Sequence, residues 1–350
     1  ITFTLTGSLK LAQVKLKQKA IRSYFSLKSM IDLQSIKKTV IFKLFDALVL
    51  PIASYGCQIW LPQTKFTTAF SSRNKFPQLK EIAEDQIEKV HLSFLKWTIG
   101  VGKRTSNAGV WGDTGRYPIA IEASPQVFNY VRRLESMETS GSEALVRHAF
   151  TEQKKMGLSW YSGITSMNQF LAETNERQQS PFQKRDVLRS CFRTQWDEER
   201  QLNRKLGFYN SIKSSFGCEK YLSLYLPYKQ SKRLAQIRTS SHRLNIETGR
   251  HGHFRRNNIL NRICPTCSTK EKNTLEYMAE LPFFDPIIED EVHVLRTCPL
   301  YQDSRDRLSS EAKTNLFEGM DLIFTQPKLL KEIAKFLVDI DALRFPRDVA

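Results

Sequence analysis

Four metal-ligating residues, arranged in two pairs, constrain the folding of this chain more than any other feature of its sequence. Cys264 and Cys267 form a C-x2-C pair, and after 25 further residues His293 and Cys298 form an H-x4-C pair. Two thiolates on one tight turn, together with an imidazole and a thiolate on a second element, can close a tetrahedral zinc site. We therefore predict that these four residues hold one structural Zn²⁺.

All four ligands of this predicted site are protein groups, so no coordination position remains for an activated water. The unit between Arg250 and Asp303 is small and has few apolar residues. Because small units bury proportionally less surface, metal–thiolate bonds are expected to stabilise it. The alternatives are a chance cluster of buried cysteines with an unrelated histidine, or a site in which His251 or His253 replaces one ligand.

The chain also carries a large excess of positive charge. Its 53 Lys and Arg residues against 36 Asp and Glu residues give a net charge of +17. A content of 41% hydrophobic and 11% aromatic residues excludes a disordered basic tail. A folded protein with this charge is expected to bind a polyanion, either nucleic acid or an anionic membrane surface.

Two groups of basic residues predict where a polyanion binds. The first group precedes the cysteine pairs and is accompanied by a single acid, Glu247. Guanidinium groups bind phosphates through paired hydrogen bonds, and a run of them favours nucleic acid. The second group lies on one face of a predicted N-terminal helix. For both groups the alternative is a solvated charged face. The predicted nucleic-acid-binding residues are Lys232, Arg233, Arg238, Arg243, Arg250, Arg255, Arg256 and Arg262 in the first group, and Lys10, Lys15, Lys19 and Arg22 in the second.

Apolar residues recur at helical spacing through most of the chain, so the predicted fold class is mainly α. Val14, Ile21 and Phe25 define the apolar face predicted for the first helix, and a later helix is predicted over residues 79–97, ending at Gly100. The predicted domains are residues 1–8, a short strand; 9–137, a helical domain; 138–230, a helical linking region; 231–312, a basic helix followed by the zinc-binding segment; and 313–350, a helical tail.

Two catalytic motifs are matched only in part. Asp113-Thr114-Gly115 has the triplet of aspartic proteases, but it follows Trp111-Gly112 rather than a buried apolar strand, so it predicts a turn. Residues 100–103 (GVGK) are followed by Arg104 where a phosphate-binding loop needs Ser or Thr. We therefore predict no catalytic residue in this chain.

The sequence favours an intracellular protein without a membrane partner. The most apolar stretch, residues 47–57, is interrupted by Pro51 and is shorter than the ~20 residues of a bilayer span. The opening residues lack the pattern of a secretory signal, and six cysteines in 350 residues do not form a disulfide scaffold. We expect the protein in the nucleus, the cytoplasm or both.

Three blocks of sequence, in this order, resemble a known family. They are residues 43–51 (KLFDALVLP) with 55–60 (YGCQIW); residues 94–96 (FLK) with 110–118 (VWGDTGRYP); and residues 234–250 (LAQIRTSSHRLNIETGR) with the CPTC pair, 289–293 (EDEVH) and 298–301 (CPLY). The first two look like the thumb of a LINE-type (non-LTR) retrotransposon reverse transcriptase, and the third is similar to its C-terminal CCHC zinc-binding segment. The resemblance covers about residues 1–310.

This resemblance implies a fold and a set of partners. Residues 1–8 would close the palm, 9–137 would be the thumb, and the family's zinc ligands fall on Cys264, Cys267, His293 and Cys298. The chain would be the nucleic-acid-binding C-terminal fragment of an RNA-directed DNA polymerase. In target-primed reverse transcription it would grip template–primer, element RNA or target DNA. The resemblance does not predict an oligomeric state.

The resemblance also implies what this chain does not supply. Family polymerases hold Mg²⁺ with a palm Tyr/Phe-x-Asp-Asp signature, and no adjacent Asp-Asp pair occurs in this sequence. The palm and endonuclease regions have no counterpart here, so the chain alone is expected to be inactive as a polymerase. The alternatives are a free-standing, non-enzymatic, zinc-dependent nucleic-acid-binding protein derived from a decayed or co-opted element, and a zinc module for protein contacts.

Overall fold

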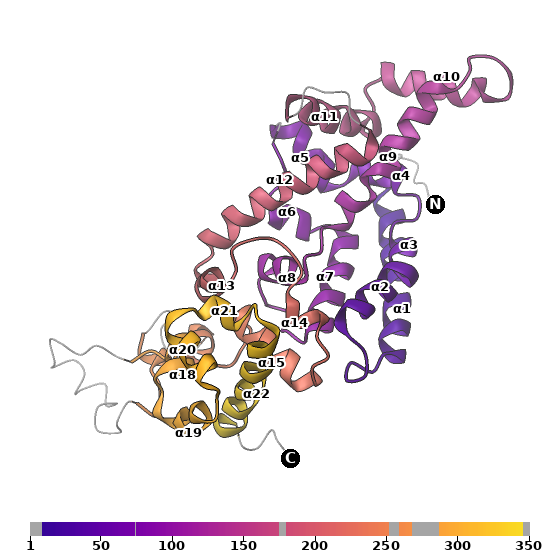
Figure 1. Ribbon diagram of the computed structural model, residues 1–350. Helices are drawn as coiled ribbons and strands as arrows, with labels where there is room; N and C mark the ends of the chain where they lie inside the picture. The colour runs from indigo at the N-terminus through magenta and orange to yellow at the C-terminus, as the bar shows by residue number, and fades with distance from the viewer. Residues whose placement is uncertain (1–8, 74, 175–179, 252–258, 268–286, 346–350) are drawn as a thin grey trace. The chain divides into compact units, whose positions relative to one another are not determined.

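A computed structural model of the protein describes residues 9–73, 75–174, 180–251, 259–267 and 287–345. Nearly all of its regular structure is helical (Figure 1). Ile263 and Ile288 form an isolated antiparallel β bridge. The prediction of a mainly α fold is confirmed. The strand predicted over residues 1–8 lies outside the described residues.

The chain forms two compact units. The first comprises residues 1–32, 39–98 and 114–202, and the second comprises 33–38, 99–113 and 203–350. The predicted boundary at residue 137 therefore falls inside the first unit and the one at residue 230 inside the second. Residues 138–202 remain with the first unit because α12 (Pro181–Leu202) packs along α9 (Ile119–Ser136), where Arg189 pairs with Glu122.

The first unit is a layered array of helices around an aromatic core. Phe45 and Phe94 stack with their ring centroids 4.1 Å apart, and Tyr24 and Phe42 meet Phe94 edge-on. Gly163 permits a close approach of two segments, because a Cβ at that position would lie 2.2 Å from the Pro62 carbonyl oxygen. The remaining elements of this unit are α1 (Lys10–Met30), α2 (Lys38–Leu48), α3 (Leu50–Ala53), α4 (Cys57–Trp60), η1 (Leu61–Gln63), α5 (Lys65–Arg73), α6 (Leu79–Ala83), α7 (Gln86–Ile99), η2 (Gly141–Glu143), α10 (Ala144–Lys155) and α11 (Ser159–Thr174).

The buried face of α1 differs from the predicted one. The helix buries Ala20, Tyr24 and Leu27, whereas Val14 and Phe25 are 41% and 56% exposed. Tyr24 and Phe25 are neighbours in sequence, so only one of them can point toward Phe94, and Tyr24 does. The predicted apolar face of α1 is therefore wrong, and Phe25 lies on the surface.

The helix predicted over residues 79–97 is divided into α6 and α7. Asp85 stands between them, and its Oδ1 accepts hydrogen bonds from the backbone N–H groups of Ile87 (2.9 Å) and Glu88 (3.4 Å). This side chain satisfies donors that a new helix start leaves open, so it begins α7 rather than continuing α6. As predicted, the second helix ends at Gly100, which has a left-handed φ of 76°.

The second unit contains the predicted zinc ligands, and its C-terminal helix α22 (Pro327–Arg344) packs against α15 (Tyr228–Arg238) (Figure 1). Leu330, Ile333 and Leu337 of α22 are buried. Residues 313–344 are therefore helical, as predicted, and part of this core. The remaining elements are α8 (Asn107–Thr114), η3 (Arg204–Leu206), α13 (Gly207–Ile212), α14 (Lys220–Ser223), α16 (Asn245–Thr248), η4 (Gly249–His251), η5 (Ile259–Arg262), α18 (Glu291–Arg296), η7 (Pro299–Tyr301), α19 (Gln302–Asp306), α20 (Ser310–Glu318) and α21 (Met320–Ile323).

In the described part of the chain no single helix is both long enough and apolar enough to span a bilayer. The segments Lys38–Leu48 and Leu50–Phe70 reach the required hydropathy only as a pair, and that pair is bent by 42°.

Candidate metal centre

The two cysteines of the CPTC pair lie on a turn that follows the Ile263–Ile288 bridge. The Cys264 N–H donates to the Ile287 carbonyl (2.8 Å), and the Glu289 N–H donates to the Arg262 carbonyl (2.8 Å). These bonds, on either side of the Ile263–Ile288 bridge, hold the Cys264–Cys267 turn against the segment that leads into α18. The bridge therefore brings the two ligand pairs together across the 25 residues that separate them in sequence.

The second pair is positioned by α18 and its C-terminal end. Asp290 caps the helix, and its Oδ1 accepts from the His293 N–H at 2.7 Å. At the other end the N–H groups of Thr297 and Cys298 both donate to the His293 carbonyl at 2.9 Å. One turn of helix thus carries the imidazole and the third thiol, and its closing hydrogen bonds fix their separation.

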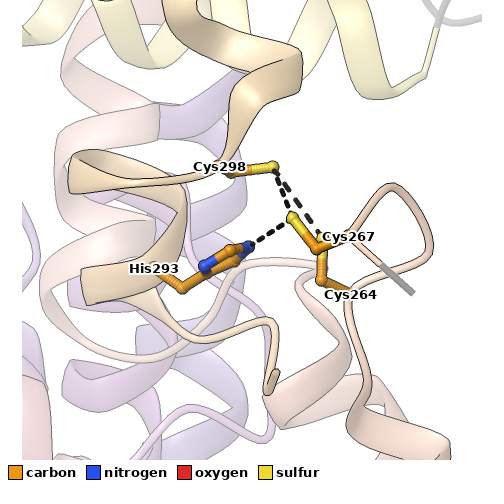
Figure 2. Close-up of side chains that lie close together, drawn as sticks. All are labelled: Cys264, Cys267, His293 and Cys298. Atoms are coloured by element: carbon orange, nitrogen blue, oxygen red, sulfur yellow. Dashed lines mark hydrogen bonds between the residues drawn. The ribbon is translucent and has the colours of Figure 1, made fainter. Parts of the chain in front are cut away.

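The four predicted ligands converge (Figure 2). The Cys264 and Cys298 sulfurs are 3.8 Å apart, the Cys267 and Cys298 sulfurs are 4.0 Å apart, and Cys267 Sγ lies 3.4 Å from His293 Nε2. All four ligand atoms lie within 4.8 Å of one another. Bonds of about 2.3 Å to sulfur and about 2.05 Å to nitrogen at the tetrahedral angle give edges of about 3.8 and 3.6 Å. The cluster therefore has the dimensions of a four-coordinate metal site.

Burial makes the charged thiolate forms of these residues costly without a compensating cation. Cys264 and Cys298 are each 1% exposed, and Cys267 and His293 are partly exposed. Burial, together with the neighbouring Cys264, raises the pKa of Cys267 to about 12 and also raises the pKa of Cys298. Burial lowers the pKa of His293, which favours the neutral imidazole that a metal requires. A bound cation would stabilise the thiolates, and its binding would release their protons.

Neighbouring polar groups orient the ligands, and the sequence analysis did not identify them. Thr297 Oγ1 lies 3.0 Å from His293 Nδ1, so Nε2 is the nitrogen that faces the three sulfurs. Arg305 donates to the Val294 carbonyl (3.2 Å) and to the Cys298 carbonyl, which places a buried guanidinium behind the third thiol. A sequence signal for the cap existed in the spacing Asp290-x-x-His293, which is the spacing of an N-cap and its N3 residue.

The arrangement can bind a metal ion but offers it no reactive position. Three sulfurs and one nitrogen complete a tetrahedral shell, so no site remains for water or substrate. The alternative ligands are not part of this cluster as described: His253 lies outside the described residues, and of His251 only the backbone, in η4, is described.

The basic residues of the first group mostly have acidic partners. Arg233 pairs with Asp341, and Arg250 pairs with Glu247 (3.1 Å). Arg243 is exposed and lies over the Phe345 ring at 4.0 Å, and Lys232 and Arg262 are half-buried. Arg255 and Arg256 lie outside the described residues. Most of the described side chains in this group therefore already contact carboxylates or rings.

Arg238 is placed in the core, which corrects its prediction as a surface contact. Its side chain is 0% exposed, with Nε 2.8 Å from Asp113 Oδ1 and Nη2 2.9 Å from Glu219 Oε2. Tyr221 donates to the other oxygen of Asp113 at 2.6 Å. A guanidinium enclosed by two carboxylates cannot reach a phosphate.

Asp113 and Thr114 do not lie in the predicted turn, because they are the last two residues of helix α8.

The second group lies on α1, where Lys15, Lys19 and Arg22 are exposed. Lys10 begins the helix, and its side chain is not among those described. The structure thus places three of the four predicted residues on one exposed helix.

Comparison with known proteins identifies no relative: no family model, no curated protein and no solved structure matches this chain.

Proposed function

We propose that this chain binds nucleic acid, that its second unit is built around one structural Zn²⁺, and that it corresponds to the thumb and C-terminal region of a LINE-type reverse transcriptase. The observation that carries the proposal is the convergence of Cys264, Cys267, His293 and Cys298, four residues from two segments 25 residues apart. These are the positions on which the family's zinc ligands fall.

The donor set favours zinc among the metals a cell offers. Three thiolates and one imidazole in a tetrahedron suit Zn²⁺, which has no geometric preference of its own and accepts sulfur and nitrogen together. Hard cations such as Mg²⁺ and Ca²⁺ prefer oxygen ligands such as carboxylates and carbonyls, and the cluster contains none. With Zn²⁺ bound, three thiolates leave a net charge of −1, and Arg305 lies close to Cys298 with the opposite charge.

The net charge of +17 and the composition of α1 support nucleic acid as the partner. Residues 10–30 contain six Lys or Arg residues and no Asp or Glu, and the exposed Lys15, Lys19 and Arg22 follow one another along the helix. A rise of about 1.5 Å per residue spreads them over about 10 Å, which allows them to follow a phosphate backbone rather than a single anion. Such contacts position a nucleic acid without reading its sequence.

The test compares two variants of equal charge. K15S/K19S/R22S removes the exposed cations of α1, and K65S/K154S/K155S removes three exposed lysines elsewhere in the same unit, two of which have carboxylate partners. We expect parental affinity for a labelled RNA–DNA duplex, measured by fluorescence anisotropy, to fall steeply between about 50 and 200 mM salt.

The α1 variant should flatten the plot of log Kd against log salt by about two to three units, since each phosphate contact contributes about 0.7–0.9. The control variant should keep the parental slope. Parental binding that is independent of salt, or equal effects of the two variants, would contradict the proposal.

A further inference from the structure

An aromatic side chain lies exposed at the end of the basic stretch of α1. Phe25 is 56% exposed, and it follows the exposed Arg22 by about one turn of helix. Single exposed apolar residues are common and need no explanation. The Phe25 ring, however, has both a cation and a second aromatic ring next to it.

Lys28 lies between Phe25 and a second aromatic residue. Its Nζ is 5.9 Å from the Phe25 centroid and 5.7 Å from the centroid of the half-buried Trp97 of α7. Tyr24 packs below them, 5.3 Å from Phe25 and 6.0 Å from Trp97, between centroids. The ring of Phe25 is therefore supported from beneath by other aromatic groups, with a cation at its side.

Charge complementarity identifies the class of partner. The helix carries six Lys or Arg residues and no acidic residue, so its exposed face attracts polyanions. Cations that follow a backbone, together with an aromatic face on which a base can stack, are the two components of single-strand binding sites. A duplex offers only base edges in its grooves and has no free base face for such a ring.

We propose that α1 is a single-strand binding site, in which Lys15, Lys19 and Arg22 contact consecutive phosphates and an unpaired base stacks on Phe25 beside Lys28. This inference rests on the proposed function and specifies its substrate: an unpaired RNA or DNA segment, bound without sequence selection. Lys28 adds a cation–π contact to Phe25 and one further charge for the backbone.

The experiment measures two affinities for each variant of the full chain. F25A should weaken binding of a labelled 12-nucleotide oligo(U) by about five-fold or more, since stacking is worth about 1–3 kcal/mol per base. Binding of a blunt duplex at the same salt should be unchanged. F25W should retain parental affinity for oligo(U), because it restores the aromatic face.

Met30 provides the matched control, since it is 70% exposed on the same helix and has no aromatic face. M30A should bind both ligands like the parent, and circular dichroism melting should show that F25A folds normally. If F25A binds oligo(U) as well as the parent does, while the parental salt dependence persists, the stacking site is refuted and the proposed function stands.

If F25A weakens duplex and single strand equally, the single-strand assignment is refuted. If F25A instead abolishes self-association of the parent in analytical ultracentrifugation, with unchanged oligo(U) binding, Phe25 belongs to a protein interface and the inference is overturned. A parent without salt-dependent binding to either ligand would overturn the proposed function and this inference together.

Discussion

Replacing Arg238 with methionine should destabilise the second unit severely without touching a nucleic-acid contact. The guanidinium is fully buried between Asp113 and Glu219, and Lys213 also pairs with Glu219. The two cations and two carboxylates of this network sum to zero charge. Burial alone lowers the pKa of Arg238, but the two carboxylates outweigh it and raise the pKa, so the group stays charged.

The size of the effect follows from what the substitution leaves behind. Arg238→Met fills similar volume but leaves Asp113, which is 0% exposed, without its cation. Removing one partner of a buried ion pair costs about 3–5 kcal/mol because the other charge stays buried and uncompensated. For a unit of this size that loss corresponds to a fall of about 6–20 °C in Tm.

The assay is urea and thermal unfolding followed by circular dichroism, with a second variant that isolates the charge. R238M/D113N removes both members of the Arg238–Asp113 pair, so it should recover a large part of the lost stability, as neutral replacement of a buried pair often does. Nucleic-acid affinity of R238M, measured below its Tm, should equal that of the parent. The reasoning fails if R238M unfolds at the parental midpoint, or if it binds nucleic acid weakly while its stability is unchanged.

Two further predictions concern the metal and the chemistry. C264S, and equally chelation of the parent, should reduce zinc from one ion per chain to none and open residues 259–267 and 287–303 to limited proteolysis. C218S is a control at an exposed cysteine outside the cluster and should keep its zinc. Zinc bound at parental stoichiometry in C264S would count against the site. The chain should also incorporate no nucleotide on a primed RNA template with Mg²⁺ or Mn²⁺, because it has no Asp-Asp pair to hold catalytic ions; extension by demonstrably pure protein would refute this.

The cluster of Cys264, Cys267, His293 and Cys298 could be predicted from the sequence because the spacing of each pair is a local feature. Cysteine and histidine are few in this chain, and a C-x2-C pair places both thiols on one turn whatever the rest of the fold does. The supporting groups could not be predicted in the same way. Thr and Arg are common residues, and nothing in the sequence distinguishes Thr297 and Arg305 from others of their type. They contact His293 and Val294 only because of the way residues 291–306 fold.

The partners of the arginines could not be predicted, because they come from distant parts of the chain. In the sequence, residues 232–262 hold one acid among many cations, which favours a phosphate-binding surface. In the structure, Arg238 meets Asp113 across a separation of 125 residues, and Arg233 meets Asp341 across 108. A local excess of charge therefore does not establish a free surface. On α1, which has no acidic residue, Lys15, Lys19 and Arg22 are exposed, and this helix is the better candidate for nucleic acid.

The C-terminal helix changes the expected role of the metal. The sequence between Arg250 and Asp303 has few apolar residues, which predicts that metal–thiolate bonds supply the stability that a small core does not. The structure buries Val294, Leu295 and Tyr301 near the ligands and adds the apolar face of α22 to the same unit.

Polar contacts connect the end of α22 to the ligand-bearing segments. Arg344 pairs with the buried Glu289 and donates to Asn245 Oδ1 at 3.0 Å, and Asn245 in turn donates to the Ile263 carbonyl at 2.9 Å. The residue beside Cys264 is thus held by hydrogen bonds that do not involve the four predicted ligands. Because neither this network nor the packing of α15 against α22 uses one of the four Cys and His residues, metal loss should release the Cys264–Cys267 turn and α18 first, and α15 and α22 should remain folded against each other.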